Sequence, residues 1–190
     1  MFSTKKKYYL IIENTRDIDL NNIKLSNKFI IIYRNNNKIE SITELKRFRS
    51  NCRIKKIGFF VANNWKLLTL LKADGLYISA HNKDLSLSRF RKINYQLIGS
   101  IHNIRELSIK RKQMCSTYIV SRLFKTNYKF KDSFFGVIKF NLFDISGRGS
   151  FVALGGININ NLNKLKLVNS DLVALLSQVK KKPAIISRLF

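Results

Sequence analysis

The sequence predicts an α/β fold, a single (β/α)₈ TIM barrel formed by residues 1–190. Short apolar runs alternate with segments of helical patterning, which is typical of βαβ units around a parallel sheet. Eight such units without a long insertion suit a closed barrel at the small end of its usual size. A doubly wound open sheet is the alternative, because periodicity does not distinguish the two.

The expected strands are continuous apolar runs, as in a parallel sheet buried on both faces. In order they are Tyr8–Ile12, Phe29–Tyr33, Ile57–Val61, Leu76–Ser79, Gln96–Ser100, Thr117–Ser121, Phe151–Leu154 and Leu172–Leu176. The amphipathic segments between them are expected to be helices. These are Ile39–Phe48, Trp65–Leu71, Leu85–Phe90, Ile104–Lys110, Phe134–Phe143 and Leu162–Leu167. No shift in composition marks a domain boundary, so one domain is expected.

Lys and Arg number 36 against 11 Asp and Glu, a formal net charge of +25. Such a charge promotes association with polyanions, although the abundance of Ile, Asn and Lys also fits AT-rich codons. In a barrel the basic clusters would form the bottom face, where cations complement helix C-termini. Polyanion contact on this face is the alternative to a simply solvated surface. The clusters are Lys5–Lys7, Arg53–Lys56, Arg91–Lys92, Lys110–Lys112 and Lys164–Lys166.

Cysteine usage and apolar run lengths indicate a cytoplasmic protein. Cys52 and Cys115 lie far apart, without Cys or His neighbours at metal-ligand spacing, which argues against a disulfide framework or a zinc site. The early apolar run Tyr8–Ile12 is too short for a membrane span or a signal segment. We expect no membrane partner.

The run Phe151–Ile157 ends in Gly155 and Gly156 and leads into an Asn-rich helix start. Glycine lets the backbone turn sharply and approach a ligand, and a helix N-terminus adds donors that suit phosphate. A lone pair of glycines is more often a plain turn. In barrels, however, phosphate commonly lies in the loops after strands seven and eight. The eighth strand brings Ser177 to this corner, so Gly156 and Ser177 are expected to lie side by side.

Polar residues recur at the ends of the other strands, at the pole where barrels bind ligands. An arginine there can hold a diphosphate through two parallel hydrogen bonds. Singly, each residue could be only a helix cap; the recurrence favours a site. The segments are Tyr33–Asn35, Asn63–Asn64, His81–Asn82, Ser100–Asn103 and Ser121–Lys129.

Four segments, in order, resemble thiamine-phosphate synthases and their TenI relatives. They are Ser100-Ile-His102-Asn103, Tyr118–Lys129, Ala153-Leu-Gly-Gly-Ile157 and Ser170–Ser177. The resemblance implies a transferase of thiamine biosynthesis. It would join hydroxymethylpyrimidine diphosphate to thiazole phosphate and release diphosphate with Mg²⁺. A metal-independent TenI-like or inactive barrel that binds a phosphorylated thiazole is one alternative, and a basic nucleic-acid-binding barrel is another.

The resemblance also implies roles for particular residues. Arg34, Ser100 and Lys129 would stabilise the departing diphosphate by their charge and hydrogen bonds. The substrate-binding positions would be Asn64, Thr126, Gly155, Gly156 and Ser177, the last three around the thiazole phosphate.

Two departures concern the metal. The family's Mg²⁺-ligating Asp after strand three reads Asn64, and the acidic position after strand four reads Asn82, with Asp84 nearby. Magnesium prefers carboxylate oxygens, so the Mg²⁺ that the family implies is doubtful here. The thiazole-phosphate half of the site is better kept.

Overall fold

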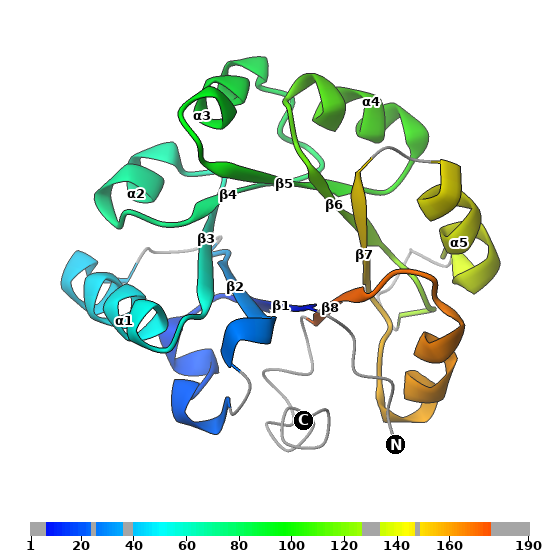
Figure 1. The fold of residues 1–190 in the computed structure, drawn as a ribbon, viewed down its shortest axis with the longest axis horizontal. Coiled ribbons are helices and arrows are strands. Elements are labelled where there is room, and N and C mark those ends of the chain that lie inside the picture. Colours follow the sequence, from blue (N-terminus) through cyan, green and yellow to red (C-terminus); the bar gives the residue numbers. More distant parts are fainter. Residues whose placement is uncertain (1–6, 24–25, 36–39, 127–133, 147–148, 176–190) are drawn as a thin grey trace.

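Eight parallel strands close into a barrel, each paired with the next along the chain and β1 paired with β8 (Figure 1). The computed structural model describes residues 7–23, 26–35, 40–126, 134–146 and 149–175. The predicted (β/α)₈ barrel is therefore confirmed, and the alternative of an open sheet is excluded. The strands are β1 Lys7–Ile12, β2 Phe29–Tyr33, β3 Gly58–Ala62, β4 Gly75–Ile78, β5 Gln96–Ile101, β6 Thr117–Ser121, β7 Ser150–Leu154 and β8 Leu172–Leu175.

Helices surround the barrel as Figure 1 shows. They are α1 Ile42–Ile54, α2 Trp65–Leu70, η4 Leu85–Ser88 with α3 Arg89–Lys92, α4 Ile104–Lys112, α5 Gly136–Ser146 and η5 Ile159–Leu167, where η marks a 3₁₀ helix. Polar caps begin several of them, because Ser41, Asn64 and Asn103 each accept a backbone N–H from the first turn. In its described residues, the connection from β1 to β2 contains three 3₁₀ turns and no α-helix: η1 Thr15–Asp17, η2 Leu20–Asn22 and η3 Ser26–Lys28.

Several of the expected helices differ from the structure, among them Leu85–Phe90, which is a 3₁₀ helix over Leu85–Ser88. The segment expected at Ile39–Phe48 forms a helix from Ile42 to Ile54, because Ser41 caps it. The segment after Gly156 is a 3₁₀ helix rather than an α-helix, and it already begins at Ile159. Asn158 caps it, and asparagine side chains compete with backbone hydrogen bonds inside an α-helix.

Alternation along the strands separates two apolar layers. One layer fills the barrel, with side chains such as Ile32, Ile98 and Ile119, and the other lies between strands and helices. Side chains two residues further along a strand point the same way. The next positions after these three are Arg34, Ser100 and Ser121, at the C-terminal mouth of the barrel. In the part of the chain that the structure describes, no helix is long and apolar enough to cross a bilayer.

Candidate active site at the mouth of the barrel

Arg34, Tyr77 and Ser100 meet at the mouth of the barrel from β2, β4 and β5. Tyr77 and Ser100 are buried, and Arg34 is half-buried. Burial raises the pKa of Tyr77, while a hydrogen bond with Ser100 and the charge of Arg34 act in the opposite direction. The Nε of Arg34 is buried and no described residue accepts its hydrogen bond. Because such a donor is costly to leave unpaired, this cluster suits an anion entering the mouth.

The Gly155–Gly156 turn rests against the loop after β6. Both glycines have positive φ, +98° and +71°. A Cβ on Gly155 would lie 3.1 Å from the Cα of Arg122, and one on Gly156 would lie 2.6 Å from the carbonyl oxygen of Lys125 and also contact that of Phe124. Only glycine fits both the backbone angles and the space. The turn is therefore fixed beside the loop that carries Thr126.

Hydrogen bonds join this turn to its surroundings but leave two of its backbone N–H donors unused. Phe124 donates to the carbonyl of Gly155 at 3.0 Å, and the Asn161 amide donates to the carbonyl of Gly156 at 2.7 Å. Among the described residues, no hydrogen bond uses the backbone N–H of Gly156 or Ile157 as its donor. Such unpaired N–H groups ahead of a capped helix form a suitable cradle for phosphate.

The prediction that Gly156 and Ser177 lie side by side can be followed only as far as the strands that precede them. Strands β7 and β8 pair in parallel, with Leu154 opposite Ala174, so their C-terminal ends lie at the same pole. Ser177 and Lys129 lie outside the described residues. Thr126 is half-buried and its hydroxyl lies 3.5 Å from the guanidinium of Arg122.

Comparison with known proteins decides the family. A family model described as thiamine monophosphate synthase (TMP-TENI) matches residues 10–179. The chain belongs to this family. The resemblance predicted from the motifs is thus confirmed. Its family is one of thiamine biosynthesis.

Three relatives of the chain illustrate the similarity. The thiamine-phosphate synthase of Methanococcus vannielii is 22% identical over 94% of this chain and 89% of its own length. That of Prochlorococcus marinus is 27% identical over 74% of this chain, which spans only 41% of that longer protein. That of Clostridioides difficile is 24% identical over 93% of this chain and 81% of its own length.

Solved structures share the fold. The thiamine phosphate pyrophosphorylase from Pyrococcus furiosus superposes with a TM-score of 0.72 at 19% identity, covering 98% of both chains. A 2-keto-3-deoxy-6-phospho-gluconate aldolase from Zymomonas mobilis reaches 0.64 at 11% identity, over 98% of this chain and 93% of that one. At these identities the structures support the barrel fold alone.

The residues at the family's metal positions do not fit Mg²⁺. The Oδ1 of Asn64 accepts the N–H of Leu67 at 2.9 Å, as the cap of α2. The Oδ1 of Asn82 accepts the N–H of Asp84 at 3.0 Å, and Asp84 itself caps η4. No group of three His, Cys, Asp or Glu side chains within the described ranges could hold a metal ion. Because Mg²⁺ prefers carboxylate oxygens, the neutral amides at these positions make a poor Mg²⁺ site.

Lys110 contributes to this pole in a way that the sequence did not predict. It was expected on the basic bottom face, but it is fully buried. Its Nζ donates to the carbonyls of Ser79 at 2.7 Å and Asn82 at 2.6 Å, and to Gln113 at 3.0 Å. Burial lowers its pKa to about 8. The only sequence signal was Gly99 inside a strand, because a Cβ there would lie 2.8 Å from the Cγ of Lys110.

The two histidines lie at the same pole, after β4 and β5. The rings of His81 and His102 are 6.4 Å apart, and both side chains are exposed. Glu106 accepts a hydrogen bond from the backbone N–H of His102 and lies 3.0 Å from its Nδ1. The carboxylate thus orients His102. Within the described residues, neither ring is hydrogen-bonded to Arg34, Tyr77 or Ser100.

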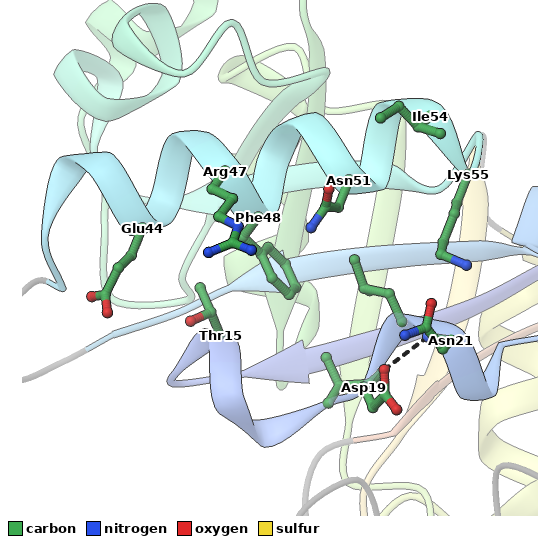
Figure 2. A pocket seen from close by; sticks show the side chains of 11 residues that line it. Thr15, Asp19, Asn21, Glu44, Arg47, Phe48, Asn51, Ile54 and Lys55 are labelled. Atoms are coloured by element: carbon green, nitrogen blue, oxygen red, sulfur yellow. Dashed lines mark hydrogen bonds between the residues drawn. The ribbon is translucent and has the colours of Figure 1, made fainter.

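A cavity of about 400 Å³ lies elsewhere, on the outer wall between α1 and the 3₁₀ turns η1 and η2 (Figure 2). Its space exists because the β1–β2 connection forms no α-helix in the described residues. None of the predicted site residues within the described ranges lines it. The lining residues are Thr15, Ile18, Asp19, Leu20, Asn21, Glu44, Arg47, Phe48, Asn51, Ile54 and Lys55.

Proposed function

We propose that the chain is a thiamine-phosphate synthase-like transferase. It joins hydroxymethylpyrimidine diphosphate to thiazole phosphate. The observation that carries this proposal is the unpaired, buried Nε of Arg34 beside Tyr77 and Ser100. A second donor group, the Gly156 turn, belongs to the same barrel mouth. Two anion sites at one mouth suit a reaction between two phosphorylated substrates.

The reaction requires charge stabilisation more than acid–base chemistry. The bond between the pyrimidine methylene carbon and the diphosphate oxygen breaks, and diphosphate leaves with the electron pair. The thiazole nitrogen then donates its lone pair to the methylene carbon. In this scheme Arg34 and Ser100 hold the diphosphate oxygens as negative charge develops, while Gly155 and Gly156 hold the thiazole phosphate beside Thr126.

The remaining predicted residues complete the scheme as proposals. Lys129 would add positive charge to the leaving diphosphate, and Ser177 would add a hydroxyl to the phosphate cradle. Asn64 would contact the pyrimidine substrate through its Nδ2 atom, since its Oδ1 caps α2. A cytoplasmic location suits Cys52 and Cys115, which are buried, free thiols.

Diphosphate release from the two purified substrates tests the proposal. Release by the wild type, and its loss in Arg34→Met with unchanged folding, would support it. The proposal would be rejected if no diphosphate is released with any divalent metal. If thiazole phosphate alone then still raises the melting temperature, the TenI-like or inactive alternative holds instead.

A second candidate function is contact with a polyanion through the bottom face. Each described loop that leads from a helix into one of the strands β3 to β6 carries exposed cations, or has them at its helix end. Asp74 lies on the same face, but its carboxylate is paired with Arg49 at 2.6 Å. Nucleic acid should then bind with an affinity that falls steeply with salt. The exposed cations are Arg53, Lys56, Lys72, Arg91, Lys92, Arg111 and Lys112.

A charge-matched pair of double variants tests this face. Arg111→Glu with Lys112→Glu should weaken binding of a fluorescent DNA duplex and reduce the salt dependence. Lys46→Glu with Lys66→Glu changes the same charge near the opposite ends of their helices and should have less effect. Equal losses in both would show only a general charge effect and reject the face.

A further inference from the structure

The oxygens at the family's two metal positions are already used by the chain's own backbone. The Oδ1 of Asn64 accepts the N–H of Leu67, and the Oδ1 of Asn82 accepts that of Asp84. The carboxylate of Asp84 in turn caps η4. A divalent cation prefers carboxylate oxygens, whereas here it would have to compete for neutral amides with hydrogen bonds that hold the two loops in shape.

A positive charge is already fixed at the second of these positions. Lys110 is fully buried, and its Nζ lies 2.6 Å from the carbonyl oxygen of Asn82. Its other two acceptors are the carbonyl of Ser79 and the Oε1 of Gln113, at 2.7 and 3.0 Å. Three acceptor oxygens match the three N–H groups of an ammonium, whereas a neutral amine has only two. The group is therefore a charged ammonium, which repels a metal ion that approaches the loop between β4 and η4.

Buried negative charge that could balance this ammonium is missing from the described part of the chain. The layer that fills the barrel beneath the mouth consists of hydrophobic side chains such as Ile32 and Val152. Among the described residues, no carboxylate forms an ion pair with Arg34 or Lys110. The field at this pole therefore favours an anion and disfavours a dication. None of the buried polar side chains that the structure describes is acidic: they are Ser100, Lys110, Gln113 and Ser170.

Arg34 is the group at this mouth that suits a phosphate oxygen. Its Nε is buried, and no described residue accepts its hydrogen bond. A guanidinium presents its N–H donors in one fixed plane, where they match the oxygens of a phosphate in pairs. Tyr77 and Ser100 share a hydrogen bond beside it. A diphosphate can thus accept hydrogen bonds from the protein directly, with no metal ion between them.

We propose that the chain binds the diphosphate group directly through Arg34, without a divalent cation. The inference rests on the proposed transferase function, in which diphosphate is the leaving group. The bond from the pyrimidine methylene carbon to the diphosphate oxygen breaks, and its electron pair stays on that oxygen. The guanidinium of Arg34 holds the negative charge that develops there. The thiazole nitrogen supplies the electron pair for the new bond to the methylene carbon, so the step needs no further reactant.

Calorimetric titration of the purified full chain with inorganic diphosphate, in EDTA and again in excess Mg²⁺, tests the inference. The wild type should bind diphosphate in EDTA, and excess Mg²⁺ should weaken the binding because it complexes free diphosphate. Arg34→Met should lose about tenfold or more of the affinity in EDTA. Arg47→Met is the matched control, since Arg47 is exposed on α1 and its loss should leave the affinity unchanged. Binding that requires Mg²⁺, absence of binding in both solutions, or equal losses in the two variants would overturn the inference.

Release of diphosphate from the two substrates, followed in the same two solutions, separates this inference from the proposed function. Release in EDTA at a rate that Mg²⁺ does not raise supports both. Release that occurs only with Mg²⁺ overturns the inference and leaves the proposed function in place. Tight binding of inorganic diphosphate in EDTA without release from the substrates in either solution overturns the proposed function and supports a metal-free diphosphate site at Arg34.

Discussion

Replacement of Gly156 by alanine should cost considerably more stability than the same replacement at Gly136. The two glycines have almost equal backbone angles, with φ of +71° and +70°. Alanine in this left-handed region costs about 1–2 kcal/mol at either position. At Gly136 the added Cβ would meet only a ring carbon of Phe134 at 4.0 Å. Gly136→Ala therefore measures the backbone cost alone.

At Gly156 the Cβ also collides with two carbonyl oxygens, those of Phe124 and Lys125. Both belong to backbone, so the loops after β6 and β7 must separate. Overpacking of this kind costs about 1–3 kcal/mol more, which gives a total loss of about 2–5 kcal/mol for Gly156→Ala. In a chain of this size each kcal/mol lowers the melting temperature by about 2–4 °C.

Thermal and urea unfolding of the two variants and the wild type measure the difference. Gly156→Ala should melt about 4–20 °C below the wild type, and its affinity for thiazole phosphate should fall. Equal melting temperatures for the two variants would refute the packing of the turn on the β6 loop.

Three further predictions concern single side chains at the mouth. Arg34→Met should leave the free energy of unfolding unchanged or raised, because the buried Nε has no described partner. The variant should nevertheless lose the rise in melting temperature that inorganic diphosphate causes in the wild type. A variant that diphosphate still stabilises would contradict the role of Arg34. Lys110→Met should cost about 1–3 kcal/mol, since Gln113 Oε1 loses its donor, while the carbonyls of Ser79 and Asn82 each keep one other donor. The folded pKa of Lys110, about 8, lies below its unfolded value of 10.5, so the unfolded chain binds more protons between these values. The difference in unfolding free energy between the wild type and Lys110→Met should therefore rise with pH across that window. Urea titrations at several pH values measure it. A constant or falling difference would contradict the lowered pKa of buried Lys110. Asn64→Asp should keep the α2 cap and increase the dependence of diphosphate release on Mg²⁺; an unchanged metal titration would favour metal-independent chemistry.

The barrel could be predicted from the sequence because a parallel sheet buried on both faces requires continuous apolar runs. Runs such as Phe29–Tyr33 and Thr117–Ser121 coincide with β2 and β6. The pole of the site followed from topology, since parallel strands place all their C-terminal ends together. Arg34 and Ser100 could be found in this way without any knowledge of side-chain contacts.

Three-dimensional contacts determined the features that the sequence did not reveal. Tyr77 belongs to a strand and reads as core, although its hydroxyl belongs to the Arg34 cluster. Lys110 reads as part of a basic cluster because charge patterning does not show that Gly99 opens a space beneath α4. The amide caps Asn64 and Asn82 were expected at the substrate or metal, while local backbone groups use their oxygens.

The contact of the glycine turn with the β6 loop has a consequence for engineering this barrel. At Gly156 the turn lies directly against the backbone of Phe124 and Lys125, so no side chain can be shortened there to absorb a displacement. Any insertion around Phe124 would shift the proposed phosphate anchor at Gly156 together with the loop of Thr126, the proposed wall beside the thiazole. Altered substrate choice should therefore arise by changing both loops at once, and libraries that vary only one of them should yield mostly inactive chains.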